Sequence, residues 1–151
     1  MAPKNRSLPV NTVLPHVHYQ NLGEAMAWLM KVFGFLEHYR YGNGPSGGQM
    51  WVGKAAIQVR QAAAGERTPA QLGYGTQSLT VFIDDVDAHY ERAKAAGAKI
   101  VEEPHETAYG EYQYGAEDLD GHHWLFSRHA TDRNPEEWGA VLAHSAAIVR
   151  P

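Results

Sequence analysis

The sequence predicts an α+β fold built from two fused βαβββ modules and followed by a C-terminal helix. Two observations carry this prediction. A strand pattern, a capped helix pattern and a closing glycine occur in the same order in both halves of the chain, with the glycines at Gly34 and Gly97. Shorter strand patterns follow each helix. Because a single module would leave one face of its sheet uncovered, the two modules are expected to lie side by side and enclose a cleft.

In the first half, β-branched residues predict a strand over Val10–Tyr19. Asn21 is suited to cap the next helix, whose apolar residues recur at helical spacing up to Phe33, and Gly34 is suited to end it in a left-handed conformation. The remaining elements predicted for this half are strands over Phe35–Tyr41, Gly48–Val52 and Ala55–Gln61, and a connector over Ala62–Gly73.

The second half repeats this order. A strand over Ser78–Ile83 precedes a helix that Asp84 or Asp85 caps and Gly97 closes. Further strands are predicted from Ile100 onward, over Tyr109–Ala116 and over His122–Arg128, and a last helix over Arg133–Ile148. We therefore expect a flexible arm at 1–9, one domain at 10–130 with modules at about 10–62 and about 76–130, and a helical extension at 131–151.

Composition excludes several classes of function. The chain has no cysteine, which removes disulfide scaffolds, thiolate metal sites and a cysteine nucleophile. A net charge of −4 without a basic stripe argues against a nucleic-acid partner. No apolar run is long enough for a membrane span and the first residues lack the apolar core of a signal peptide, so a cytoplasmic protein is expected. No nucleotide-binding or nucleophile-elbow motif is present.

Three stretches carry a family resemblance: Asn21–Phe35, Phe82–Gly97 and Tyr109–Phe126. Together with the paired module layout, they resemble the vicinal-oxygen-chelate superfamily, which includes glyoxalase I, methylmalonyl-CoA epimerase, extradiol dioxygenases and bleomycin-resistance proteins. The last stretch is especially similar to the PhnB-like branch. The resemblance covers about residues 10–130 and implies a glyoxalase/bleomycin-resistance-type cleft and a homodimer. It specifies the fold better than the reaction, because one fold hosts many chemistries.

The resemblance also implies where a metal would bind. Metalloenzymes of this family carry one ligand on the first and last strand of each module, and these positions correspond here to Leu14, Gln58, Ser78 and Leu125. A leucine side chain has no lone pair to donate, whereas such cations need imidazole or carboxylate donors. We therefore expect the usual metal site to be lost, and no cofactor to be required.

Strand alternation predicts which side chains line the cleft. His16 and His18 are candidate general bases, and Arg60 is a candidate anchor for a carboxylate or phosphate. The other predicted ligand-binding residues are Gln58, Ser78, Thr80, Phe82, Tyr114 and His123. The opposite faces are apolar, as packing against helices requires, at Val13, Val17, Ile57, Val59, Leu79, Val81, Trp124 and Phe126.

Each candidate has a structural alternative. His16 and His18 would lie at the rim and bind water or backbone, and Arg60 would pair with a structural carboxylate. His16 and His18 with His123 would instead form a displaced metal site. Tyr114, with Tyr109 and Tyr112, would gate the cleft or pack within the sheet.

Three functions remain open at this level. The first is a metal-independent protein that binds a small organic ligand between the modules. The second is a lyase or isomerase that acts on a small carbonyl or carboxylate compound. The third is a drug-sequestering resistance protein, which the acidic balance favours only weakly.

Overall fold

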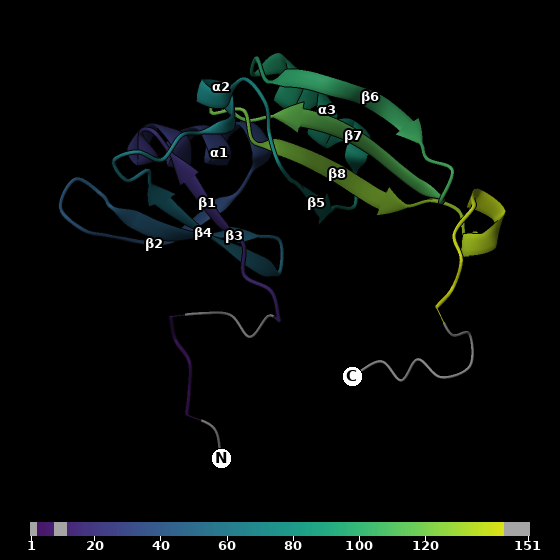
Figure 1. Ribbon diagram of the computed structural model, residues 1–151, viewed down its shortest axis with the longest axis horizontal. Coiled ribbons are helices and arrows are strands. Elements are labelled where there is room, and N and C mark those ends of the chain that lie inside the picture. The colour runs from purple at the N-terminus through teal and green to yellow at the C-terminus, as the bar shows by residue number, and fades with distance from the viewer. Residues whose placement is uncertain (1–2, 8–11, 144–151) are drawn as a thin grey trace.

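The computed structural model of the protein describes residues 3–7 and 12–143, and it contains two four-stranded sheets of the same design (Figure 1). The first sheet has the order β1-β4-β3-β2, formed by β1 (His16–Tyr19), β2 (Leu36–Tyr41), β3 (Gly47–Val52) and β4 (Ala55–Gln61). The second sheet has the order β5-β8-β7-β6, formed by β5 (Ser78–Phe82), β6 (Lys99–Glu106), β7 (Glu111–Glu117) and β8 (His123–His129). In each sheet the first strand pairs in parallel with the last, and the other pairs are antiparallel. The predicted pair of βαβββ modules is confirmed.

The two long helices begin and end where the capping signals predict. The side chain of Asn21 accepts a 3.1 Å hydrogen bond from the Glu24 amide at the start of α1 (Leu22–Phe33), and Gly34 ends that helix at φ +75°. Asp85, the second of the two predicted caps, accepts from the Ala88 amide at the start of α3 (Val86–Ala95). Both helices are therefore positioned by local side-chain chemistry.

The start of β1 and the connector differ from the prediction. β1 begins only at His16, and Pro15 precedes it, contributing its carbonyl to the amide of Gln58 at 2.9 Å. A proline has no amide hydrogen for the ladder, so the regular strand starts after it. The connector contains a one-turn helix, α2 (Pro69–Leu72), which Thr68 caps together with Gln71 in a reciprocal capping box.

The C-terminal helix is present but shorter than predicted. It is a single 3₁₀ turn, η1 (Pro135–Trp138), and Gly139 ends it at φ +92°. The positive φ of Gly139 stops helical propagation, because a right-handed helix needs negative φ. Residues 144–148 of the predicted helix lie outside the described residues.

The two modules share one apolar core. The Phe33 ring at the end of α1 lies 4.8 Å from the Phe126 ring and 6.1 Å from the Trp124 ring of β8. The predicted helix-facing residues Val17, Ile57, Val59, Trp124 and Phe126 are buried there, and Leu79 and Val81 pack against them. Val13 is the exception, since it lies outside β1 and is 73% exposed.

Polar contacts join the end of β1 to the turn between β7 and β8. The backbone amide of Gln20 donates to the carboxylate of Asp120 at 2.9 Å, and Nε2 of His122 donates to the backbone carbonyl of His18 at 2.8 Å. These bonds fix the position of the two modules relative to each other at one end of β1.

In the part of the chain that the structure describes, no helix is both long and apolar enough to cross a membrane.

Candidate functional site

The polar face of the first sheet carries most of the predicted site residues. The register pairs His16 with Gln58 and His18 with Arg60, so these four side chains share the face opposite the core. Gln49, which pairs with Gln58 from β3, is fully buried on the same face. Its Nε2 donates to Oε1 of Gln58 at 2.7 Å, and its Oε1 accepts from Nδ1 of His38 at 2.6 Å. Gln58 is therefore part of a hydrogen-bonded row that sequence reasoning did not identify.

Arg60 is engaged within the protein. Both terminal nitrogens of its guanidinium donate to the carboxylate oxygens of Glu66, each over 2.6 Å. The hydrogen bond from Arg60 is the main reason that the pKa of Glu66 falls to about 2. Arg60 thus forms the bidentate ion pair expected of it, but with a carboxylate of its own chain rather than with a ligand.

The predicted residues of the second module lie on the polar face of β5 and β8. The register pairs Ser78 with His123 and Thr80 with Leu125. Ser78, Thr80 and Phe82 are exposed, Phe82 to 67%. Nε2 of His123 is buried without a hydrogen-bond partner, and it lies 3.1 Å from where a Cβ on Gly115 would stand. Among the described residues, no hydrogen bond or ion pair connects this face with the polar face of the first sheet.

The prediction for Tyr114 is wrong in its placement. Tyr114 is fully buried on the helix-facing side of β7, and its hydroxyl lies within hydrogen-bond distance of Nδ1 of His89 in α3. Burial raises the pKa of this phenol, so it stays protonated in the core. The register pairs Tyr114 with Phe126, which faces the helices, so Tyr114 lies on the same side of the sheet.

The residues at the family's metal positions do not fit a metal ion. Leu14 and Leu125 have no donor atoms, and Oε1 of Gln58 already accepts a hydrogen bond from Gln49. Ser78 contributes only an exposed hydroxyl. Within residues 3–7 and 12–143, no group of three or more His, Asp or Glu side chains is arranged to hold a metal, the displaced histidine set included.

A cavity of about 750 Å³ lies between the two modules, at the opposite end of β1 from the polar contacts described above. The turn between β3 and β4 forms one wall and β5 forms the other. Its lining residues are Val13, Pro15, Val52, Gly53, Lys54, Ala55, Ala56, Ile57, Leu79, Thr80, Val81, Phe82, Ile83, Asp84 and Trp124. Of the residues predicted to bind a ligand, only Thr80 and Phe82 line it. The remaining lining residues were not predicted. Strand alternation identifies the residues on one face of a strand, whereas consecutive residues of β5, from both of its faces, line this cavity.

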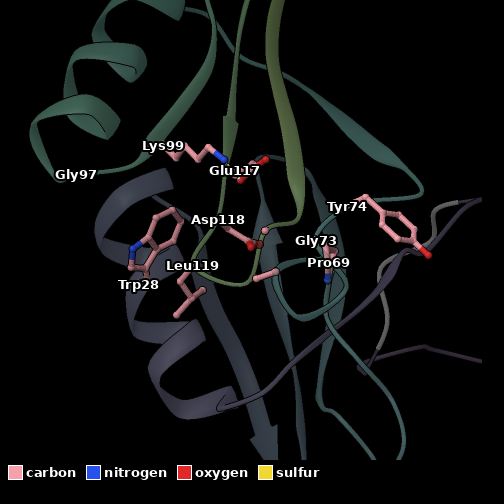
Figure 2. Close-up of a pocket in the computed structure, with 12 residues that line it drawn as sticks. Trp28, Pro69, Gly73, Tyr74, Gly97, Lys99, Glu117, Asp118 and Leu119 are labelled. Atoms are coloured by element: carbon pink, nitrogen blue, oxygen red, sulfur yellow. Dashed lines mark ion pairs between the residues drawn. The ribbon is translucent and has the colours of Figure 1, made fainter.

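A second cavity, of about 460 Å³, lies near the start of β6 and the end of β7 (Figure 2). Trp28 of α1 and Leu119 stand on one side of it, and Gly73 and Pro69 stand on the other (Figure 2). Its charged groups are already paired, since Nζ of Lys99 lies 3.2 Å from a carboxylate oxygen of Glu117. The cavity between the modules is larger and presents more apolar surface than this one.

Fold and site together define a two-module α+β protein with an apolar cavity at the module junction. The chain belongs to the Glyoxalase/Bleomycin resistance protein/Dioxygenase superfamily, whose family model matches residues 14–126. This finding confirms the resemblance at the level of the superfamily.

Individual relatives share part of the sequence or the fold of this chain. TioX from Micromonospora sp. ML1 is 28% identical with a TM-score of 0.66, and the match covers 82% of this chain and all of TioX. A superfamily domain from Frankia sp. EAN1pec has the same fold, with a TM-score of 0.65 at 15% identity, over 79% of this chain and 97% of that one. The uncharacterized protein Mb0911c of Mycobacterium bovis is 26% identical over 85% of this chain and 90% of its own length.

Proposed function

We propose that the protein binds a small, largely apolar organic molecule in the cavity between its modules. The observation that carries the proposal is the cavity itself: about 750 Å³, bounded mainly by aliphatic and aromatic side chains. Small-molecule sites in proteins are typically concave, apolar and roughly 300–1,000 Å³ in volume. Binding would bury the apolar surface of the ligand against Ile57, Val81 and Trp124.

Two charged side chains would orient the ligand. Lys54 and Asp84 line the cavity, and neither forms an ion pair with another described residue. One polar group on an otherwise apolar ligand would therefore find a free charged partner. His16, His18 and Arg60 do not line this cavity, which favours binding over a lyase or isomerase reaction with these residues as bases and anchor.

We also propose that the protein is a homodimer in which the second copy covers the mouth of this cavity. Val13 and Phe82 line the cavity, and they are exposed to 73% and 67%. Exposed apolar side chains grouped at one place mark interaction surfaces. We further propose that the site works without a metal ion, that the protein belongs to the PhnB-like branch and that it is cytoplasmic.

Ligand binding is tested with the fluorescent probe 8-anilinonaphthalene-1-sulfonate. Ala55 lines the cavity and is exposed, so the small change in A55T should have little effect. In A55W the indole would occupy part of the cavity and should weaken probe binding at least tenfold. The matched control is A27W, at an exposed position of α1 outside the cavity, and it should leave the affinity unchanged. Equal affinities for the A55W and A27W proteins would overturn the proposed site.

The dimer is tested by sedimentation velocity. The wild-type protein should sediment as a dimer and the F82E protein as a monomer, because a charge would be buried at the proposed contact. V101E is the control, since Val101 is exposed, at 42%, on β6, the edge of the second sheet opposite β5, and does not line the cavity. Dissociation by V101E alone would place the contact elsewhere.

A further inference from the structure

A small hollow beside β1 has a lining of unusual chemistry. Its volume is about 100 Å³, and it lies between β1 and the segment that connects the two modules. The lining residues are His16, Val17, His18, Arg67, Pro69, Leu72, Tyr74, Thr76, Gln77 and His122. They include three imidazoles, a guanidinium and several neutral hydrogen-bonding side chains, but no carboxylate. This is notable in a chain whose acidic residues outnumber its basic ones by 17 to 13.

Two hydrogen bonds hold the walls of the hollow in place. Nε2 of His18 lies 3.2 Å from the backbone carbonyl of Arg67, so this nitrogen carries the hydrogen. Nε2 of His122 donates in the same way to the carbonyl of His18. The two rings meet edge to face, with their centroids 6.0 Å apart. The connector is thereby fixed across β1, and Nδ1 of both rings is left without a partner among the described residues.

The positive charge of the hollow is not neutralised by the surrounding acids. The guanidinium of Arg67 forms no ion pair with a described residue. The neighbouring Glu66 has both carboxylate oxygens bonded to Arg60. Asp120, on the turn that carries His122, accepts the backbone amide of Gln20. An anion would therefore meet a free cation and several donors at this position.

We propose that this hollow binds a small oxyanion, such as a phosphate or carboxylate group. Charge-assisted hydrogen bonds from a guanidinium to such groups are among the stronger polar contacts in proteins. The volume suits a single anionic group rather than a whole organic molecule. The proposal does not depend on a ligand in the larger cavity, because the two sites share no lining residue.

Anion binding at this site would take up protons. In their neutral forms His18 and His122 use their only ring hydrogen to bond a carbonyl, so Nδ1 presents a lone pair. An oxyanion near either Nδ1 is repelled by that lone pair and is attracted once the ring gains a proton. The other titratable groups at the hollow are His16 and Tyr74, with Arg67 as the fixed charge. The neighbouring acids are Glu66, Asp120 and the buried Asp118, whose charge also attracts a protonated His122. A bound anion should therefore favour the protonated form of these imidazoles.

The experiment is a titration of the full chain with inorganic phosphate. Isothermal titration calorimetry measures the binding in two buffers that differ in ionisation enthalpy. Wild-type protein should bind phosphate, and it should take up protons on binding sulfate, an oxyanion that does not itself titrate near neutral pH. R67Q should weaken binding about tenfold, the loss of one charge-assisted contact. K31Q removes the same charge from an exposed position on α1 and should leave the affinity unchanged. A parallel titration with acetate decides between phosphate and carboxylate.

Three outcomes would overturn the proposal. The first is the absence of saturable binding of either anion. The second is equal weakening by R67Q and K31Q, which would indicate attraction to the overall charge. The third is binding without histidine signals moving in ¹H–¹⁵N spectra of the imidazoles, which would place the anion elsewhere. Circular dichroism of each variant shows whether the fold is intact.

Discussion

Tyr19 at the end of β1 donates a 2.7 Å hydrogen bond from its hydroxyl to the carboxylate of Asp118, 99 positions later. The same carboxylate accepts from Nε1 of Trp124 and from the backbone amides of Asp120 and His122, each at 3.0 Å. Burial raises the pKa of Tyr19 well above its ordinary value, so the phenol keeps its proton and acts as the donor. One buried carboxylate thus connects the first module to the turn between β7 and β8.

The first prediction concerns this connection. Tyr19→Phe keeps the ring in the core but removes one of the four donors to Asp118, and it should lower the free energy of unfolding by about 2 kcal/mol, as expected for a hydrogen bond to a charged group. Urea unfolding followed by circular dichroism measures the change. Tyr41→Phe is the matched control, because Tyr41 is 52% exposed and its hydroxyl forms no hydrogen bond with a described residue. A loss of the same size in both variants would contradict the role of Asp118.

Local sequence signals predicted the two long helices and most strands well. The caps at Asn21 and Asp85 bond to amides only a few residues away, so the local amino-acid sequence is enough to predict them. The core-facing side of each central strand was equally predictable, because that side must be apolar to pack against the helices. Val17 and Trp124 lie in the core for this reason.

The site was harder to predict because its contacts join residues from different elements. The Arg60–Glu66 ion pair depends on how the connector turns back toward β4, and no periodic pattern encodes that turn. The face on which Tyr114 lies follows from its pairing with Phe126 in β8, and the pattern within one strand does not specify that register. The cavity arises from the packing of the modules against each other, which alternation within one strand does not describe.

The second prediction uses the ion pair between Arg60 and Glu66. Because the pKa of Glu66 falls from 4.5 to about 2 in the folded chain, the pair contributes stability above about pH 4.5 and loses it as the pH falls toward 2. Wild-type protein should therefore melt at a higher temperature than the Glu66→Gln variant at pH 6. The difference should shrink between pH 4.5 and 2.5. The side chain of Glu66 is 32% exposed, so the effect should be small and should weaken in high salt.

Thermal unfolding by calorimetry at several pH values measures this difference. Glu24→Gln serves as the control, because Glu24 is exposed and forms no ion pair with a described residue. A melting-temperature difference for Glu66→Gln that stays constant from pH 6 to pH 2.5 would show that the ion pair is not the cause.

The third prediction concerns a buried histidine. Burial lowers the pKa of His89 below 6.5, and its Nε2 donates to the carbonyl of Phe33 at 2.9 Å. The unfolded chain therefore takes up a proton at a higher pH than the folded chain does, so stability should fall as the pH drops below 6.5. His89→Gln keeps an amide donor for Phe33 and removes the titration. Urea unfolding at pH 7.5, 6.5 and 5.5 should show a shallower pH dependence for this variant than for His16→Gln, which changes an exposed imidazole. Identical slopes would refute the assignment to His89.

The last prediction concerns the turn before β7. Gly110 has a φ of +92°, and a Cβ at this position would lie 1.9 Å from the backbone oxygen of Thr131. Its own carbonyl accepts from the amides of Ala130 and Thr131, so this backbone is held on both sides. Gly110→Ala must therefore break these bonds or shift the segment after β8, and it should cost about 3 kcal/mol in urea unfolding. Gly53→Ala separates the backbone strain from the steric clash. Gly53 also has a positive φ, +61°, but nothing lies within 4 Å of its Cβ position. Only the backbone strain, about 1 kcal/mol, should therefore appear in this variant. If both alanine variants lose the same stability, the close approach to Thr131 contributes nothing and strain alone explains the requirement for glycine.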